Sequence, residues 1–233
     1  MNLFARRGAL CAAHLAVVLA APAVAAAQSN LAYVCASAGD RVAVLDATSG
    51  AASASIAVGD GPSRAALSRD GARLYVANTL ADTLSVVDTA THAVLASIAV
   101  GDAPGELAVS PDGARVYVMV ANGVVDVVDT AAGAVVQSFA SGTGSGGLAL
   151  TPDGSRLCVA GGAITALDAA SGVVLSTQVV GTAPLDVAIS PDGSRAFATF
   201  YTFYFSPVFS AGGSVAVLDT STDAIVGYVG VGS

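Results

Sequence analysis

The 233-residue chain contains no tryptophan and no lysine, and it has only two histidines and three cysteines. A multi-histidine metal site is not expected from so few histidines, and a Ser-His-Asp unit is not expected because His92 is interpreted below as a turn residue. The nine basic residues are all arginine, against 17 acidic residues, which gives a net charge of −8. Such an acidic chain is not expected to bind nucleic acid through its phosphates.

The first 27 residues are predicted to form a secretory signal peptide. Arg6 and Arg7 make a basic start, residues 8–21 an apolar core, and Ala25–Ala27 a cleavage site. An uncleaved membrane anchor is the alternative, since the apolar stretch approaches spanning length. Cleavage would leave seven arginines and 17 acidic residues, a net charge of 7 − 17 = −10. We expect a bacterial protein in the periplasm or outside the cell, with no transmembrane segment after cleavage.

The rest of the chain repeats a unit of about 40 residues. Asp-Gly pairs begin at Asp70, Asp112, Asp153 and Asp192, at spacings of 42, 41 and 39. Each unit holds four short runs rich in Val, Ile, Leu and Tyr that are bounded by turn residues, which predicts strands. Four antiparallel strands per unit predict an all-β protein built from the blades of a β-propeller.

Four sequence segments carry a family resemblance: RLYVAN, TLSVVDT, IAVGDAP and LAVSPDG. Together they resemble the YVTN-type propeller repeat, with YVAN at Tyr75–Asn78. The predicted propeller domain covers residues 28–233, with repeats at about 31–66, 67–108, 109–149, 150–188 and 189–233. The resemblance implies a fold and no single activity, because propellers carry many functions.

The strand count predicts five blades and 19 strands, three in the first blade and four in each of the others. The strand missing from the first blade is its inner one. Members of the resembled family commonly have about seven blades, and they close the ring with a strand from the far end of the chain. The resemblance therefore implies a truncated, larger seven-bladed propeller. A compact five-bladed ring is the alternative.

Aligned repeats separate structural residues from candidate functional ones. Aspartates end one strand of every unit, and these are interpreted as turn residues: Asp46, Asp88, Asp129, Asp168 and Asp219. His92 is interpreted as a turn residue too, because its equivalents are three glycines at 50, 133 and 172 and Asp223. Cys35 and Cys158 are expected to be buried free thiols without a redox role.

Charge varies at one repeated position, two residues after the loop proline, where each inner strand begins. Arg64, Glu106 and Asp186 occupy it, and Gly147 holds the equivalent position between Glu106 and Asp186. Inner strands line the channel of a propeller, so these side chains are predicted to form a binding site at a channel mouth. A solvated channel rim is the alternative.

The fifth repeat contains an insertion that the others lack, from Phe200 to Gly213. It is predicted to form an aromatic loop, whose candidate binding residues are Tyr201, Phe203, Tyr204, Phe205 and Phe209. Clustered aromatics mark interaction surfaces, so this loop is predicted to contact a ligand or partner. A hydrophobic flap folded back on its own blade is the alternative.

These observations predict an exported, non-catalytic binding or protein-interaction module. No catalytic residue, metal or cofactor is predicted, and the expected partner is an unidentified protein or small molecule at the channel mouth. One alternative is an enzyme or enzyme subunit, similar to lactonase-like hydrolases or to heavy subunits of periplasmic quinone- or haem-linked dehydrogenases. A cell-surface structural protein is the second alternative.

Overall fold

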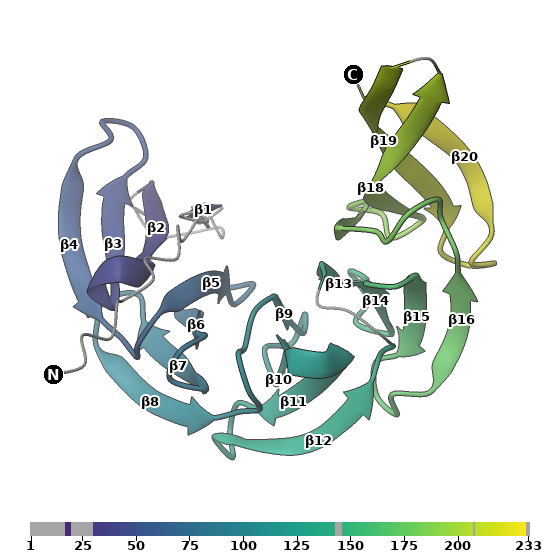
Figure 1. Cartoon of the computed structure of the whole chain (residues 1–233). Helices are drawn as coiled ribbons and strands as arrows, with labels where there is room; N and C mark the ends of the chain where they lie inside the picture. Colours follow the sequence, from purple (N-terminus) through teal and green to yellow (C-terminus); the bar gives the residue numbers. More distant parts are fainter. Residues whose placement is uncertain (1–16, 20–29, 143–145, 207, 232–233) are drawn as a thin grey trace, which may run out of the picture.

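Five four-stranded antiparallel sheets make up the computed structural model, which describes residues 17–19, 30–142, 146–206 and 208–231. The sheets stand side by side as blades 1 to 5 of an open arc (Figure 1). Within each blade the strands follow one another in chain order, from the inner strand beside the axis to an outer edge strand. The predicted all-β propeller of four-stranded blades is therefore confirmed.

The blades are named by their order along the chain. Blade 1 comprises β1 (Val17–Leu19), β2 (Leu31–Ala36), β3 (Arg41–Asp46) and β4 (Ala52–Ala57). Blade 2 comprises β5 (Pro62–Leu67), β6 (Arg73–Asn78), β7 (Thr83–Asp88) and β8 (Val94–Ala99). Blade 3 comprises β9 (Leu107–Val109), β10 (Arg115–Val120), β11 (Val124–Asp129) and β12 (Ala134–Ala140). Blade 4 comprises β13 (Leu148–Leu150), β14 (Arg156–Ala160), β15 (Ile164–Asp168) and β16 (Val174–Gln178). Blade 5 comprises β17 (Asp186–Ile189), β18 (Arg195–Ser206), β19 (Val208–Asp219) and β20 (Ile225–Gly230).

The nineteen predicted strands are β2 to β20, and β1 is an addition that the sequence did not predict. It lies inside the predicted signal peptide and pairs antiparallel with β2, which gives blade 1 the inner strand expected to be missing. Pairing with β1 satisfies backbone groups that would otherwise form an open sheet edge. Two short 3-10 helices, η1 (Ser37–Gly39) and η2 (Ala121–Gly123), connect strands. In the described part of the chain, no helix is long and apolar enough to cross a membrane.

The five blades do not close into a ring, because a gap separates blade 1 from blade 5 (Figure 1). The compact five-bladed ring, the alternative to a truncated propeller, is thus not formed. Consequently only one face of blade 1 and one face of blade 5 pack against a neighbouring blade.

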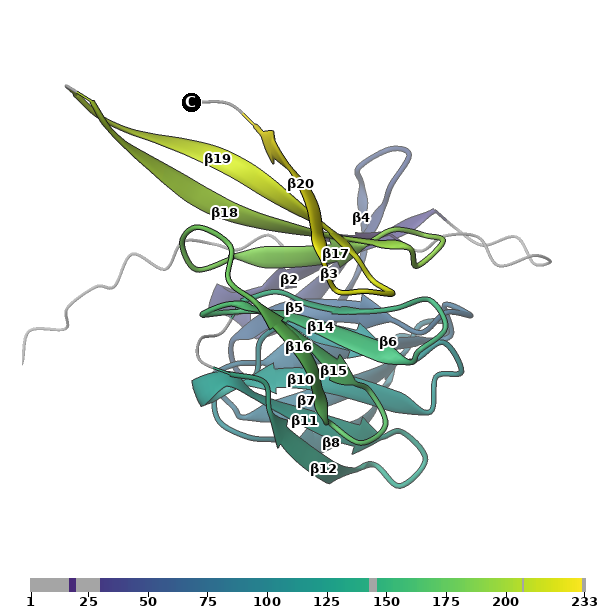
Figure 2. The same ribbon diagram turned by 90° about the vertical axis from the view of Figure 1, so that its right-hand side faces the viewer.

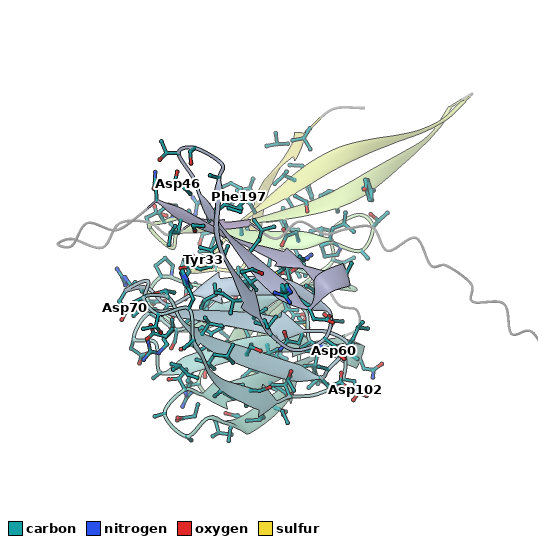
Figure 3. The ribbon with its side chains drawn as sticks, turned by 90° about the vertical axis from the view of Figure 1, so that its left-hand side faces the viewer. Tyr33, Asp46, Asp60, Asp70, Asp102 and Phe197 are labelled. Atoms are coloured by element: carbon teal, nitrogen blue, oxygen red, sulfur yellow. The ribbon has the colours of Figure 1, made fainter. Side chains whose placement is uncertain are left out.

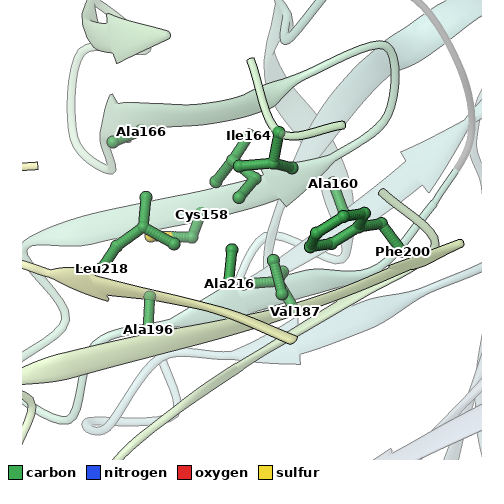
Figure 4. Close-up of a cluster of buried hydrophobic side chains, with 11 residues drawn as sticks. Cys158, Ala160, Ile164, Ala166, Val187, Ala196, Phe200, Ala216 and Leu218 are labelled. Carbon is green, nitrogen blue, oxygen red and sulfur yellow. The ribbon is translucent and has the colours of Figure 1, made fainter. Parts of the chain in front are cut away.

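Hydrophobic cores fill each boundary between neighbouring blades. Between blades 4 and 5, for example, Cys158 and Ala160 face Ala196, Phe200 and further aliphatic side chains of blade 5 (Figure 4). The remaining boundaries contain equivalent clusters. Fully burying one large apolar side chain contributes about 1.5–3 kcal/mol, so these boundaries hold the arc together.

Aspartates shape the turns at both ends of the blades (Figure 3). Asp46 Oδ1 accepts the N–H groups of Thr48 and Ser49 at 2.9 and 2.7 Å, and these bonds hold the pKa of its carboxyl below the usual value. In the Pro-Asp-Gly turn of blade 3, Asp112 accepts the Ser110 hydroxyl at 2.6 Å. The aspartates of these two turns are therefore used by the backbone and the side chains of their own turns.

Candidate functional site

Four equivalent positions at the start of the inner strands carry the predicted mouth residues. Arg64 lies in β5, Glu106 directly precedes β9, and Asp186 is the first residue of β17. Gly147 holds the fourth position, directly before β13. The backbone repeats around these positions while the charge changes, so the fold does not dictate the side chains found there.

Arg64 and Glu106 form an ion pair between blades 2 and 3. Arg64 Nε donates to Glu106 Oε1 at 2.5 Å, and Arg64 Nη1 donates to the carbonyl oxygen of Ser63 at 3.1 Å. The two side chains are 30% and 32% exposed. A pair this exposed contributes at most about 1 kcal/mol to stability. Its main effect is to fix two opposite charges on the inner rim.

A cavity of about 350 Å³ opens beside this ion pair. Thr79 Oγ1 donates to the carbonyl oxygen of Pro104 at 2.7 Å. The Ser63 and Thr79 hydroxyls share a hydrogen bond of 2.5 Å, and Ser63 is its donor because the Thr79 proton is already used. Met119 and Val120 add an apolar wall. The cavity offers a cation, an anion and hydroxyl groups, a combination that suits a small polar ligand.

Asp186 is not among the residues that line this cavity. Its carboxylate accepts the N–H of Val187 at 2.8 Å and lies directly against Gly147. Two of the three predicted mouth residues, Arg64 and Glu106, thus form a pair. The third, Asp186 of blade 5, instead contacts Gly147 beside the inner strand of blade 4.

Reactive side chains are few, and none of His92, Cys35 and Cys158 is among the residues that line the mouth cavity. His92 has a φ of 59° in the turn between β7 and β8. Cys35 and Cys158 are free and buried, and burial raises the pKa of each thiol to about 11, so neither is ionised near neutral pH. The described residues contain no group of three or more His, Cys, Asp or Glu side chains that could hold a metal ion. The polar side chains that line the mouth cavity can bind a ligand through charge pairing and hydrogen bonding.

A second candidate surface is the outward face of blade 5, which borders the gap in the arc. Phe197 of β18 occupies the position that Tyr33, Tyr75 and Tyr117 hold in blades 1 to 3, as the pairing with each inner strand shows. Each of those tyrosines is buried by the next blade, whereas Phe197 is 38% exposed. Val229 of β20 is 52% exposed on the same blade.

The predicted aromatic loop is not a loop. Residues 200–206 and 208–213 continue β18 and β19, which pair from Phe200 and Ser214 out to Ser206 and Val208. This hairpin projects away from the other blades (Figure 2). The first strand of the insertion is rich in aromatic residues and contains a threonine, and these residue types favour extended strand. The expectation of a loop was therefore wrong, although the insertion itself is present.

The aromatic residues of this hairpin differ in their surroundings. Among the predicted binding residues of the hairpin, Tyr201 is 52% exposed and is therefore accessible to a partner. Phe200 belongs to the core between blades 4 and 5, where its ring meets Tyr228 edge to face at a centroid distance of 5.9 Å. The side chains of Phe203, Tyr204, Phe205 and Phe209 lie outside the described residues.

Sequence reasoning missed Phe197 and Val229. A signal for Phe197 was available, because it stands in the YVAN-type strand where three other repeats have tyrosine. The alignment of repeats shows that Phe197 stands at a position that a neighbouring blade buries in the other repeats. Whether a blade covers Phe197 itself depends on how the blades are arranged, which the alignment does not show.

Solved structures with this arrangement are numerous, since 1469 chains match it. Hydrazine synthase of Kuenenia stuttgartiensis is similar with a TM-score of 0.76 and 26% identity, over 88% of this chain and 63% of that chain. A chain of the mitotic checkpoint complex is similar with a TM-score of 0.74 and 22% identity, over 88% of this chain and 62% of that chain. This chain thus corresponds to less than two thirds of either protein. No curated protein sequence matches it significantly.

Five four-stranded antiparallel blades arranged side by side define this chain as a β-propeller protein. A family model described as YNCE-like beta-propeller matches residues 3–130, more than half of the chain. The chain belongs to this YNCE-like β-propeller family, which agrees with the YVTN-type resemblance of its repeats.

Proposed function

We propose that the chain is an exported, non-catalytic protein-interaction module whose main partner surface is the outward face of blade 5 with its projecting hairpin. The observation that supports this most is the 38% exposure of Phe197 at a position that the other four blades bury. An aromatic side chain left partly uncovered at the end of a repeated packing series offers area that a partner can bury. Aromatic residues contribute much of the binding energy in protein interfaces.

Composition and shape support the same surface. Residues 196–218 contain no charged residue. The outer part of the hairpin extends past the last pairs that β17 and β20 form with it, so it is a two-stranded ribbon there. Two-stranded ribbons are marginally stable in water and gain from packing against another surface. An uncharged ribbon next to Phe197 suits a protein partner with an apolar patch.

The test is capture of a partner from the producing cells after cross-linking, with a tagged full chain. The double variant Phe197→Asp and Tyr201→Asp should reduce capture by about tenfold or more, because it places charge in the proposed interface. Val136→Asp is the matched control, since Val136 is 55% exposed on the outer strand β12 of another blade. Equal capture by the double variant and the original chain, at unchanged melting temperature, would refute the proposal.

Export is part of this proposal and rests on the layout of residues 1–27. A basic start, an apolar core and a small-residue site in this order favour secretion. Cell fractionation combined with N-terminal sequencing tests it: the protein outside the cytoplasm should begin at Gln28. A chain found only in the cytoplasm with residues 1–27 attached would refute it.

The cavity beside Arg64 and Glu106 favours a second candidate function, binding of a small polar ligand on the inner rim. A zwitterion could exchange the internal ion pair for two pairs of its own. Saturation-transfer NMR with a panel of free amino acids tests this, and a signal that disappears in the double variant Arg64→Ala and Glu106→Ala would support it. A signal that survives in the double variant would place the ligand elsewhere.

The likeness to hydrazine synthase supports a related alternative, in which the chain is a non-catalytic subunit of a larger enzyme. The partner captured through blade 5 would then be the catalytic subunit. Identification of that partner by mass spectrometry decides between a role in an enzyme and a role in another assembly.

A further inference from the structure

A second cavity, a groove between the turns of blades 2 and 3, lies at the opposite end of the blades from the mouth residues. Figure 3 shows Asp70 of this groove on the other side of the molecule from Asp60 and Asp102, which belong to the loops before β5 and β9. The groove has a volume of about 450 Å³ and shares no lining residue with the mouth cavity. The lining residues that matter here are Arg69, Asp70, Tyr75, Val86, Pro111 and Asp112.

Arg69 breaks the repeat in this groove. The residue before the Asp-Gly pair is proline in the next three blades, at Pro111, Pro152 and Pro191. Pro111 packs against the turn of the following blade, where a Cβ added to Gly154 would lie 2.9 Å from the proline Cδ. A Cβ added to Gly113, the glycine that follows the turn of Arg69, would meet nothing within 4 Å. Arg69 therefore does not take over the packing role of the proline.

The charged groups of the groove are only partly used by the protein itself. Arg69 is exposed and forms no hydrogen bond or ion pair within the described part of the chain. The neighbouring Arg73, by contrast, donates to Asp88 Oδ2 at 2.7 Å. Asp70 and Asp112 each accept a serine hydroxyl of their own turn on Oδ1 at 2.6 Å. No other described residue donates to Oδ2 of either carboxylate, so one cation and two carboxylate oxygens stay available.

Tyr75 adds a buried hydroxyl group to these charges. The residue is 3% exposed, yet its hydroxyl has no hydrogen-bond partner among the described residues, whereas that of Tyr117 donates to the carbonyl oxygen of Ala169 at 2.9 Å. Burial raises the pKa of the Tyr75 hydroxyl, and the charges of Arg73 and Asp70 also act on it, so the group keeps its proton and lies near these groove residues. A buried hydroxyl without a partner costs free energy, which a ligand in the groove can recover.

The available groups select a ligand by its charge and by its donors. Arg69 calls for an anion, and a guanidinium binds a carboxylate through two parallel hydrogen bonds. The free oxygens of Asp70 and Asp112 repel further anions and need donors. Hydroxyl groups are donors without charge, whereas a cationic donor would be repelled by Arg69. The ligand therefore combines one carboxylate with hydroxyl groups.

We propose that this groove binds a small hydroxylated carboxylic acid, such as a uronic acid, whose carboxylate pairs with Arg69 and whose hydroxyl groups donate to Asp70 and Asp112. The Tyr75 hydroxyl donates to another oxygen of the same ligand. Val86 and Pro111 contact the apolar C–H groups of its ring. The volume of the groove falls in the range of small-molecule sites, about 300–1,000 Å³.

The equivalent groove between blades 4 and 5 serves as a comparison within the molecule. It also has a volume of about 450 Å³. Pro152 stands there at the position of Arg69, and Cys158 at the position of Tyr75. Its arginine, Arg156, is paired with Asp223 at 2.7 Å. The two grooves thus differ in the available arginine and the tyrosine hydroxyl rather than in space.

The test is isothermal titration calorimetry of the full chain with galacturonate and glucuronate as probes. At least one of them should bind about tenfold or more tightly than galactose, which lacks the carboxylate, and than cyclohexanecarboxylate, which lacks the hydroxyl groups. Arg69→Pro, which introduces the residue found in the next three blades, should weaken binding by about tenfold or more. Tyr75→Phe should weaken it by about threefold or more.

Two variants control for charge and for the mouth cavity. Arg41→Ala removes another exposed arginine, and the double variant Arg64→Ala and Glu106→Ala removes the ion pair of the mouth; both should bind the uronate as the original chain does. Arg69→Gln replaces Arg69→Pro in the comparison if proline lowers the melting temperature. Failure of both uronates to bind, unchanged affinity after replacement of Arg69, or loss of binding in the mouth variant would overturn the proposal. None of these results bears on the blade 5 surface, which partner capture tests.

Discussion

Truncating equivalent aromatic residues in blades 3 and 5 should have unequal effects on stability. Tyr117 is 2% exposed between blades 3 and 4, and its hydroxyl donates to the carbonyl oxygen of Ala169 at 2.9 Å. Phe197 occupies the same position in blade 5, the blade that borders the gap in the arc (Figure 1). The perturbation is Tyr117→Ala in one variant and Phe197→Ala in the other.

The expected magnitudes follow from burial. Replacing a buried aromatic residue by alanine costs about 3–5 kcal/mol, and leaving the Ala169 carbonyl without its donor adds about 1 kcal/mol. At Phe197 no closed cavity forms, because the face opens to solvent. The loss there is the transfer of the covered part of one side chain, about 1–2 kcal/mol.

Urea denaturation followed by far-ultraviolet circular dichroism measures both variants, since the chain has no tryptophan for a fluorescence assay. Tyr117→Ala should shift the midpoint at least about twice as far as Phe197→Ala. Equal shifts would refute the reasoning, because they would mean that Phe197 is covered in solution and that blade 5 has no free face. That result would also contradict the proposed partner surface on the outward face of blade 5.

Three further predictions concern charged groups. Glu106→Gln should change the free energy of unfolding by at most about 1 kcal/mol, measured by the same denaturation, because the ion pair is partly exposed. Asp126→Ala should cost about 2–4 kcal/mol, because the buried Asp126 carboxylate accepts the Gly101 N–H at 2.7 Å and a hydroxyl, and both donors would lose their partner. The Ser190 hydroxyl and other turn donors lower the pKa of Asp192 from 3.8 to about 2, so its contribution to stability is present above pH 3.8 and is lost as the pH falls toward 2. Melting temperature should drop over that range, and Asp192→Asn should reduce the drop; a pH profile identical in both proteins would contradict this.

Much of the fold was predictable because the repeat makes the sequence its own alignment. Periodic Asp-Gly turns and apolar runs predicted β2 to β20, and Asp46 illustrates why: its hydrogen bonds to Thr48 and Ser49 are local. For Arg64 and Glu106, the sequence predicted only that both residues lie at the same mouth of the channel. Their shared bond and the cavity beside it depend on how blades 2 and 3 pack.

The sequence alone determined the number of blades, the strand order within them and the turn residues, because these depend on local pairing and on hydrogen bonds within a few residues. Only the tertiary structure decided that the insertion extends a hairpin, that the ring stays open, and that Val17–Leu19 complete blade 1. The open ring and the first blade depend on contacts between segments separated along the chain, whereas the hairpin depends on local pairing that the aromatic composition of the insertion did not reveal. The exposure of Phe197 is the clearest case: its sequence position matches those of buried tyrosines, and its exposure depends on which blade packs beside it.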